Sequence, residues 1–285
     1  MTDTASPSAT DDAEAADTPA QRVAAEDPAG EGPLADAFDR IVLEGAPRLQ
    51  RRLPDLLATG VVAGVEVSLG VLALLAVENA TGSPLLGGLA FSFGFIALLL
   101  GHSELFTEGF LVPVAVVAAG EASVWQMLRF WAGTAVANLA GGWLLTLIAM
   151  QAYPQLHHTA IEAGTYFIDT GYTARSLCLA IVAGATITLM TRMTNGTDSM
   201  PARLIAVVAS AFLLAGLKMS HSILESLLIF SSLHAGATSF GYADWAGWFA
   251  WTVLGNVMGG IGLVTLLRLV RSRRMLARHR EEAAA

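Results

Sequence analysis

Residues 87–117 read GGLAFSFGFIALLLGHSELFTEGFLVPVAVV, and this stretch decides the fold. It begins and ends as an apolar run of the kind that forms a membrane helix, but polar residues interrupt its middle. The interrupting residues are His102, Ser103, Glu104, Thr107 and Glu108. A charge at the bilayer centre costs about 2.5–3.5 kcal/mol on the insertion scale, and irregular backbone at membrane depth is tolerated only where protein or a water-filled cavity surrounds it. The stretch therefore predicts a broken helix that lines a pore.

The composition is that of a polytopic membrane protein. Hydrophobic residues make up 54% of the 285 residues and charged residues only 14%, with a mean hydropathy of +0.57. The net charge of −8 resides mainly in an N-terminal segment rich in Ala, Pro, Asp and Glu, which lacks the apolar content to fold. We predict a disordered acidic tail at residues 1–33, an amphipathic cytoplasmic helix at 34–55, a six-span channel domain at 56–270 and a basic cytoplasmic tail at 271–285.

Six apolar segments are long enough to cross a membrane, which requires about 20 residues each. They are residues 56–77, 86–119, 124–150, 177–193, 201–230 and 245–270. The second and fifth are too long for one pass, so we predict that both helices are broken. Arginines concentrate before the first segment, near the start of the third (Arg129), on both sides of the loop between the fourth and fifth (Arg192 and Arg203), and after the last. By the positive-inside rule both termini are cytoplasmic, and we predict a multi-pass protein of the bacterial inner membrane.

A weak internal repeat relates the two halves of the chain. The interruption GHSELFTEG in the second segment corresponds to KMSHSILES in the fifth, and AVANLAGG at 135–142 corresponds to VLGNVMGG at 253–260. Because each half contains three segments, the halves cross the membrane in opposite senses. This is a 3+3 inverted repeat, whose binding site is expected where the two broken helices meet. We interpret Asn138 and Asn256 as amides that hydrogen-bond across closely packed helices.

Ionisable residues at membrane depth are functional candidates. Lys218, the only lysine of the chain, is followed by His221 and Glu225, and on a continuous helix the three would share one face. We predict that His221 lies in a transport path. Lys218 has two interpretations, a structural ion pair with Glu104 or Glu225, or a place in the permeation path. Glu104 and Glu108 are predicted to support the broken loop by accepting hydrogen bonds from its free backbone N–H groups.

No enzyme signature is present, since the chain has no phosphate-binding loop, dinucleotide fingerprint or nucleophile elbow. We therefore expect no enzymatic activity, no cofactor, no bound metal and no nucleic-acid partner. The residues alone leave four functions open: an anion channel or proton-coupled transporter, a neutral-solute pore like an aquaglyceroporin, a membrane anchor with His102 and His221 as haem ligands, and an occluded scaffold or sensor.

Three segments carry a resemblance to a known family. AFSFGFIALLLGHSELFTEG at 90–109, MSHSILES at 219–226 and LGNVMGG at 254–260 resemble the formate/nitrite transporter family, and within it the chain looks closest to the YfdC-type branch. The resemblance implies an aquaporin-like fold of six spans and a homopentamer in the lipid bilayer. It also implies one pore in each protomer, which conducts small monovalent anions such as formate or nitrite.

The resemblance further implies a pore with two apolar constrictions around a polar centre. The outer constriction would contain Phe91, Phe95 and Leu214, the inner one Leu105, Phe106 and Ile187, and the centre Thr107 and His221. The anion would meet the histidine there and cross as the neutral acid after taking a proton, since imidazole exchanges protons near neutral pH and dewetted constrictions exclude ions. Three positions depart from the family's pattern, which has an acidic residue at Ser220, an asparagine at Glu225 and a small residue at Lys218.

Overall fold

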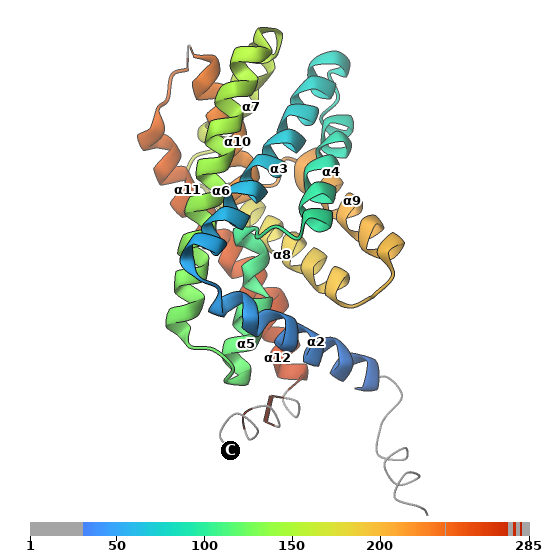
Figure 1. Cartoon of the computed structure of the whole chain (residues 1–285). Helices are drawn as coiled ribbons and strands as arrows, with labels where there is room; N and C mark the ends of the chain where they lie inside the picture. Colours follow the sequence, from blue (N-terminus) through green and yellow to red (C-terminus); the bar gives the residue numbers. More distant parts are fainter. Residues whose placement is uncertain (1–30, 237, 273–275, 278–279, 281–285) are drawn as a thin grey trace, which may run out of the picture.

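The chain is an all-α membrane protein. The computed structural model describes residues 31–236, 238–272, 276–277 and 280, so the predicted N-terminal tail, apart from residues 31–33, and most of the predicted C-terminal tail lie outside the described residues. All regular structure in the described part is helical (Figure 1). Five helices there are long and apolar enough to cross a membrane. The six-pass count stays a prediction, because α9 and α10 have only 17 and 14 residues.

The helices of the first half are α2 (Glu31–Gln50), α3 (Leu53–Thr81), α4 (Pro84–Gly101), the 3₁₀ turn η1 (Phe106–Phe110), α5 (Val112–Ala119) and α6 (Val124–Ala152). Those of the second half are the 3₁₀ turn η2 (Pro154–Leu156), α7 (His157–Asp169), α8 (Ala174–Asn195), α9 (Met200–Gly216), α10 (Ser222–Ala235), α11 (Tyr242–Val257), the π-helical segment η3 (Met258–Thr265) and α12 (Leu266–Arg271).

Local sequence signals set several helix ends. Ser83 caps α4, and capping boxes at Ser123 and Thr173 begin α6 and α8, so side-chain oxygens bind N–H groups that have no partner within the helix. Helices α3 and α5 end at Gly82 (φ 66°) and Gly120 (φ 89°), in the left-handed conformation that glycine adopts without steric cost.

Two glycines allow the same close helix contact in each half. A Cβ atom at Gly64 of α3 would collide with the backbone oxygen of Asn138 in α6, and one at Gly184 of α8 would collide with the backbone oxygen of Asn256 in α11. The small residues therefore bring the first and third helices of each half into backbone contact. This contact places both asparagine side chains between the helices.

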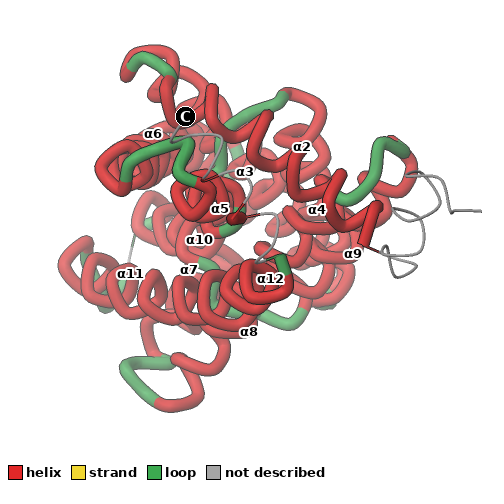
Figure 2. Tube along the Cα trace, turned by 90° about the horizontal axis from the view of Figure 1, so that it is seen from below, coloured by secondary structure: helices red, strands yellow, loops and turns green. Residues whose placement is uncertain are grey.

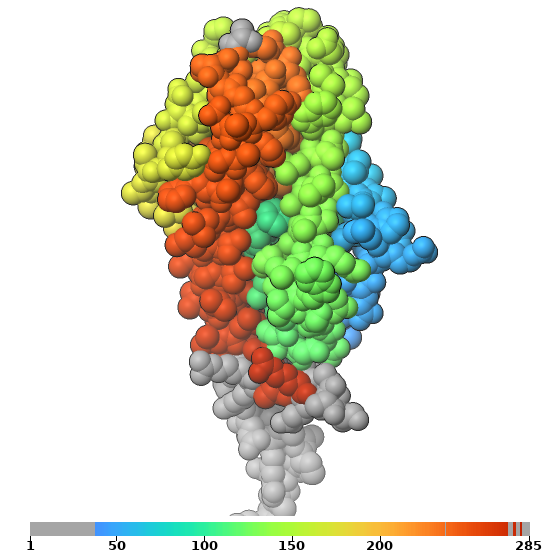
Figure 3. Space-filling model, turned by 90° about the vertical axis from the view of Figure 1, so that its left-hand side faces the viewer, coloured from blue at the N-terminus to red at the C-terminus, as the bar shows by residue number. Residues whose placement is uncertain are grey.

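The second parts of the broken helices, α5 and α10, lie inside the bundle (Figure 2). Seen from the end that carries α2 and α12, α5 and α10 are near the centre, with α3, α4, α9, α8, α11 and α6 around them (Figure 2). Residues 222–232 of α10 are all buried. Helices α6 and α11 form adjacent columns on one outer face (Figure 3). The first parts of the interrupted helices, α4 and α9, also expose apolar side chains, so only the parts that follow the interruptions lie in the interior.

Two boundaries differ from the sequence-based expectation. The segment between the third and fourth predicted spans, residues 151–176, contains η2 and α7, and α7 packs against α10. The last predicted span lies within one continuous helical segment, Tyr242–Arg271. Its π-helical part η3 contains Gly259, where a Cβ would collide with the backbone oxygen of Ile181. The amphipathic helix is α2, which begins at Glu31 and ends at Gln50, and α3 already begins at Leu53.

Candidate functional site

The two interruptions share one backbone geometry. Helix α4 ends at Gly101 and is followed by His102 with φ 52°, and α9 ends at Gly216 shortly before Lys218 with φ 51°. These are the only non-glycine residues with positive φ in the described part of the chain. Each residue lies two positions before a short segment, Glu104–Phe106 or Ser220–Ser222, whose backbone is hydrogen-bonded to an asparagine side chain. The helix is therefore interrupted in the same way in both halves.

Asn138 holds the first interruption. Its Oδ1 accepts a hydrogen bond from the backbone N–H of Phe106 at 2.8 Å, and its Nδ2 donates to the backbone oxygens of Glu104 at 2.9 Å and Gly60 at 2.8 Å. The amide thus binds the carbonyl before Leu105 and the N–H after it. Backbone groups that the broken helix leaves free are satisfied inside the protein, as an interior without lipid contact requires.

Asn256 holds the second interruption with the same three contacts. Its Oδ1 accepts from the backbone N–H of Ser222, and its Nδ2 donates to the backbone oxygens of Ser220 and Ala180, each at 2.8 Å. His221 therefore occupies the position in the second half that Leu105 occupies in the first. The conformation on either side of His221 is fixed by an element outside its own helix.

His221 contacts Thr107 across the two halves. Its Nε2 lies 2.7 Å from the Thr107 Oγ1, and its Nδ1 accepts a hydrogen bond from the Leu224 backbone N–H at 3.1 Å. Because Nδ1 accepts, the proton of the neutral ring is on Nε2, which donates to the threonine hydroxyl. Both side chains are fully buried.

Apolar side chains surround this pair. Phe91 and Phe95 meet edge to face with their centroids 4.9 Å apart, and the Phe95 ring is 6.5 Å from the His221 ring. Leu214 is fully buried in the same cluster. The residues assigned to the inner constriction, Leu105, Phe106 and Ile187, are also buried there, with exposed fractions of 0%, 6% and 0%. The structure thus collects all six apolar residues in the one buried cluster.

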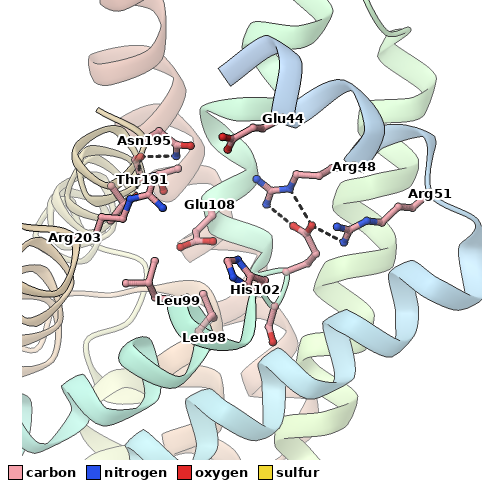
Figure 4. Close-up of a pocket in the computed structure, with 13 residues that line it drawn as sticks. Glu44, Arg48, Arg51, Leu98, Leu99, His102, Glu108, Thr191, Asn195 and Arg203 are labelled. Atoms are coloured by element: carbon pink, nitrogen blue, oxygen red, sulfur yellow. Dashed lines mark hydrogen bonds and ion pairs between the residues drawn. The ribbon is translucent and has the colours of Figure 1, made fainter. Parts of the chain in front are cut away.

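A polar cavity of about 280 Å³ opens beside the first interruption. Figure 4 shows its walls, which come from α2, the α4–η1 segment, α8 and α9. Its charged side chains are Glu44, Arg48, Arg51, Glu104, Glu108 and Arg203. The cavity lies at the end of the bundle where the predicted cytoplasmic arginines gather.

The carboxylate of Glu104 is bound by two arginines of the N-terminal region. Arg48 donates from Nε at 2.9 Å and from Nη2, and Arg51 donates from Nη1 at 2.8 Å. Burial disfavours the charge of Arg48, but the facing Glu104 carboxylate raises the pKa of this arginine above its ordinary value, so the pair is ionic. The prediction that the Glu104 side chain accepts bonds from loop N–H groups is wrong, because Asn138 accepts the N–H of Phe106 instead.

Lys218 pairs with a residue that the sequence reasoning did not consider. Its Nζ is 3.4 Å from the Oε1 of Glu78, near the end of α3, and 5.2 Å from the ring centre of Tyr166 in α7. The expected pair with Glu104 or Glu225 does not form. Because the helix is interrupted between Gly216 and Ser222, Lys218, His221 and Glu225 do not share a helical face. The lysine therefore contacts the end of α3 and helix α7.

Glu108 and Glu225 line two different cavities. Glu108 lines the 280 Å³ cavity. Glu225 is fully buried, and its Oε2 accepts a hydrogen bond from the His221 backbone N–H at 2.7 Å. Its Oε1 has no hydrogen-bond partner among the described residues.

Sequence reasoning missed Glu66 and the arginine partners of Glu104. Glu66 is half-buried in α3, inside the apolar run expected as the first span, and one of its oxygens has no partner in the described part of the chain. A Cβ at Gly101 would meet its other oxygen at 2.5 Å. The criterion that selected Glu104, a carboxylate within an apolar run, would have found Glu66 as well. No cluster of three or more metal-ligating side chains occurs among the described residues.

Interrupted helices held by asparagines, with a buried imidazole between apolar side chains, are typical of a membrane transport protein. A profile of the formate/nitrite transporter family matches residues 35–270. The chain belongs to this family, which is one of transporters and channels rather than enzymes.

Individual relatives agree with this membership. The chain is 24% identical over 259 residues to the inner membrane protein YfdC of Escherichia coli K12, with 86% of this chain and 81% of the relative covered. It is 24% identical over 235 residues to the formate channel FocA of the same strain, with 74% and 75% covered.

Solved structures show the same fold. A structure titled as an FNT family ion channel superimposes with a TM-score of 0.69 at 21% identity, covering 81% of this chain and 96% of the other. A pentameric formate channel with formate bound superimposes with a TM-score of 0.63 at 19% identity, covering 76% and 96%.

Proposed function

We propose that the chain forms a homopentameric channel of the bacterial inner membrane for small monovalent anions of weak acids, of the formate or nitrite type. Each protomer has its own pore, both termini are cytoplasmic, and a proton is exchanged at the polar centre. The relatives that are formate channels and the pentameric neighbour support this proposal. Residues 56–270 are the channel domain, with residues 34–55 before it on the cytoplasmic side.

The main support for the proposal is the contact between His221 and Thr107 inside the apolar cluster. An imidazole Nε2–H that donates to a hydroxyl at 2.7 Å can donate equally to an anion oxygen that replaces the hydroxyl. The apolar residues on both sides exclude hydrated ions but not small neutral molecules. A weak acid suits such a centre, because it exists as an anion in water and as a neutral molecule after taking a proton.

One cation of the cytoplasmic cavity supports an anionic substrate. The cavity is lined by three arginines and three glutamates, so its formal charge is balanced and only a cation without a close carboxylate partner would attract anions. Arg48 and Arg51 are both bound to Glu104. The third arginine, Arg203, has among the described ion pairs only a long one, with 3.8 Å between its Nη2 and the Oδ1 of Asp198. An anion entering from the cytoplasm would meet this side chain before the inner constriction.

Flux measurements test the proposal. Purified protein in proteoliposomes should take up formate or nitrite in a pH-dependent manner, and His221→Ala should change both the rate and the pH dependence. Thr107→Val removes the hydroxyl at nearly constant volume and should reduce uptake without changing assembly. His158→Ala is the matched control, because His158 is exposed and its ion pair within the described residues is with Glu162 on the same helix.

The same experiment separates the competing functions. A panel of small anions that gives no flux above empty vesicles at any pH would contradict the proposal and favour an occluded scaffold. Glycerol or water flux that is insensitive to His221→Ala would favour a neutral-solute pore. A purified protein with a Soret band would identify a haem anchor.

A further inference from the structure

Glu225 is a fully buried carboxyl group with one free oxygen. It lies in the first turn of α10, where its Oε2 accepts the backbone N–H of His221 at 2.7 Å. Its Oε1 is buried and has no hydrogen-bond partner among the described residues. A buried oxygen without a partner destabilises the folded state, and more so when the group is charged. This position therefore needs a function that compensates for its cost.

The side chain of Glu225 faces a small cavity near the outer end of the bundle. The cavity has about 10 Å³ of water-accessible volume, which is near the minimum for one water molecule. Its walls are apolar except for Glu78, Lys218 and Glu225. The carboxyl is thus within reach of water but is separated from bulk solvent.

No cationic side chain of the described residues forms an ion pair with Glu225. The ammonium group of Lys218 pairs with Glu78 at 3.4 Å and stands over the Tyr166 ring at 5.2 Å. The titratable groups that face the cavity or its lining are therefore Glu78 from α3, Tyr166 from α7, Lys218 and the neighbouring His221. Helices α6 and α11 and the turn η1, which also pack against α10, place no side chain in the cavity lining.

His221 cannot accept a proton in this geometry without losing a contact. Its Nε2 carries the proton that binds Thr107, and its Nδ1 accepts the Leu224 N–H that begins α10. Protonation of Nδ1 would replace this hydrogen bond by a repulsion between two donors. In contrast, a protonated Glu225 could keep Oε2 as the acceptor of the His221 N–H and donate from Oε1 into the cavity.

We propose that Glu225 is the proton-exchanging group of this pore and that His221 orients the anion. The inference rests on the proposed function and specifies its proton source. In the inward direction, the O–H bond of the Glu225 carboxyl breaks as an O–H bond forms on the anion, which leaves as the neutral acid. The resulting carboxylate regains a proton from a hydronium ion that reaches the outer cavity, and water is released. Lys218 and Glu78 form the charged boundary that this proton passes.

The transport test uses formate uptake by reconstituted protein at varied external pH. Glu225→Gln keeps the shape and the acceptor oxygen for His221 but cannot release a proton. We expect the rise of uptake at low external pH to fall by about a hundredfold or more, as expected for removal of a positioned proton-transferring group. Glu162→Gln on the exposed side of α7 is the matched control and should behave as wild type. A Glu225→Gln protein that retains the wild-type dependence on external pH would overturn the inference.

Infrared difference spectroscopy tests the carboxyl group without any transport. The wild-type protein should show a carbonyl band of a protonated carboxylic acid that is absent in Glu225→Gln, shifts in D₂O and disappears as the pH is raised. Absence of such a band at every pH would overturn the inference. If wild-type protein carries none of the probe anions, the proposed function fails, and the infrared result alone then decides whether Glu225 exchanges protons. Elution of both proteins at the same size shows that the substitution leaves assembly intact.

Discussion

Replacing Asn138 or Asn256 by alanine should destabilise the protein by the same amount. Each amide makes three hydrogen bonds of 2.8–2.9 Å to backbone groups, and both side chains are fully buried. At the membrane-protein average of about 0.6 kcal/mol for each bond, the loss is about 2 kcal/mol. Backbone groups left without partners raise it further, so we expect about 2–4 kcal/mol at either site.

The contribution of the individual contacts can be separated by a second substitution. Asn→Asp at either position keeps the oxygen that accepts the N–H of Phe106 or Ser222 but loses both donated bonds, so most of the loss should remain. Asn195→Ala is the control, because this half-buried amide makes a single bond, to the Thr191 oxygen at 2.7 Å, and should cost about 0.5 kcal/mol.

The measurement is the free energy of unfolding in mixed micelles, obtained by titration with a denaturing detergent. A loss at Asn138 or Asn256 no larger than that of Asn195→Ala would refute the role of these amides in holding the broken helices. A large loss at only one of the two would refute the equivalence of the two halves.

Three further predictions concern stability in the same assay. His102→Gly should stabilise the protein by about 1 kcal/mol, because glycine adopts the left-handed conformation without steric cost, and His102→Ala should show no such gain. Glu104→Gln should lower the free energy of unfolding by about 1–3 kcal/mol, because it removes the carboxylate from a buried ion pair whose arginines are partly hydrated. Arg51→Ala should lower it by less than about 1 kcal/mol, since 36% of that side chain is exposed. Gly64→Ala and Gly184→Ala should each cost about 1–3 kcal/mol through overpacking against a backbone oxygen, and a neutral effect at either would contradict the close contact of these helices.

The interruptions could be located from the sequence because their cause is local. Polar residues in a long apolar run identify the segments around His102 and His221, and the repeated small-residue patches identify Asn138 and Asn256. The hydrogen bonds between them were not predictable in detail, because they join residues 32–36 positions apart. Only the close helix contact, which depends on glycine, brings these groups together.

The partners of the charged residues were predicted wrongly for a physical reason. Helical periodicity suggested Glu225 as one possible partner of Lys218, but the left-handed residue Lys218 interrupts the helix, and its side chain contacts Glu78 instead. Glu104 likewise contacts Arg48 and Arg51, which are more than 50 residues away. Helix α7 escaped prediction because it packs on α10 with 13 residues, too few to read as a span.

The two interruptions have equivalent backbones but different side chains, so the two sides of the pore centre differ chemically in a fold with two similar halves. Asn138 and Asn256 hold the backbone of both segments alike, so the halves differ there only in their side chains. The position between the asparagine contacts is Leu105 in the first half and His221 in the second. One side of the centre is therefore apolar and the other carries an imidazole next to the buried carboxyl of Glu225. If the pore exchanges protons, this asymmetry assigns the exchange to the outer half. A permeating molecule then passes one constriction as the anion and the other as the neutral acid.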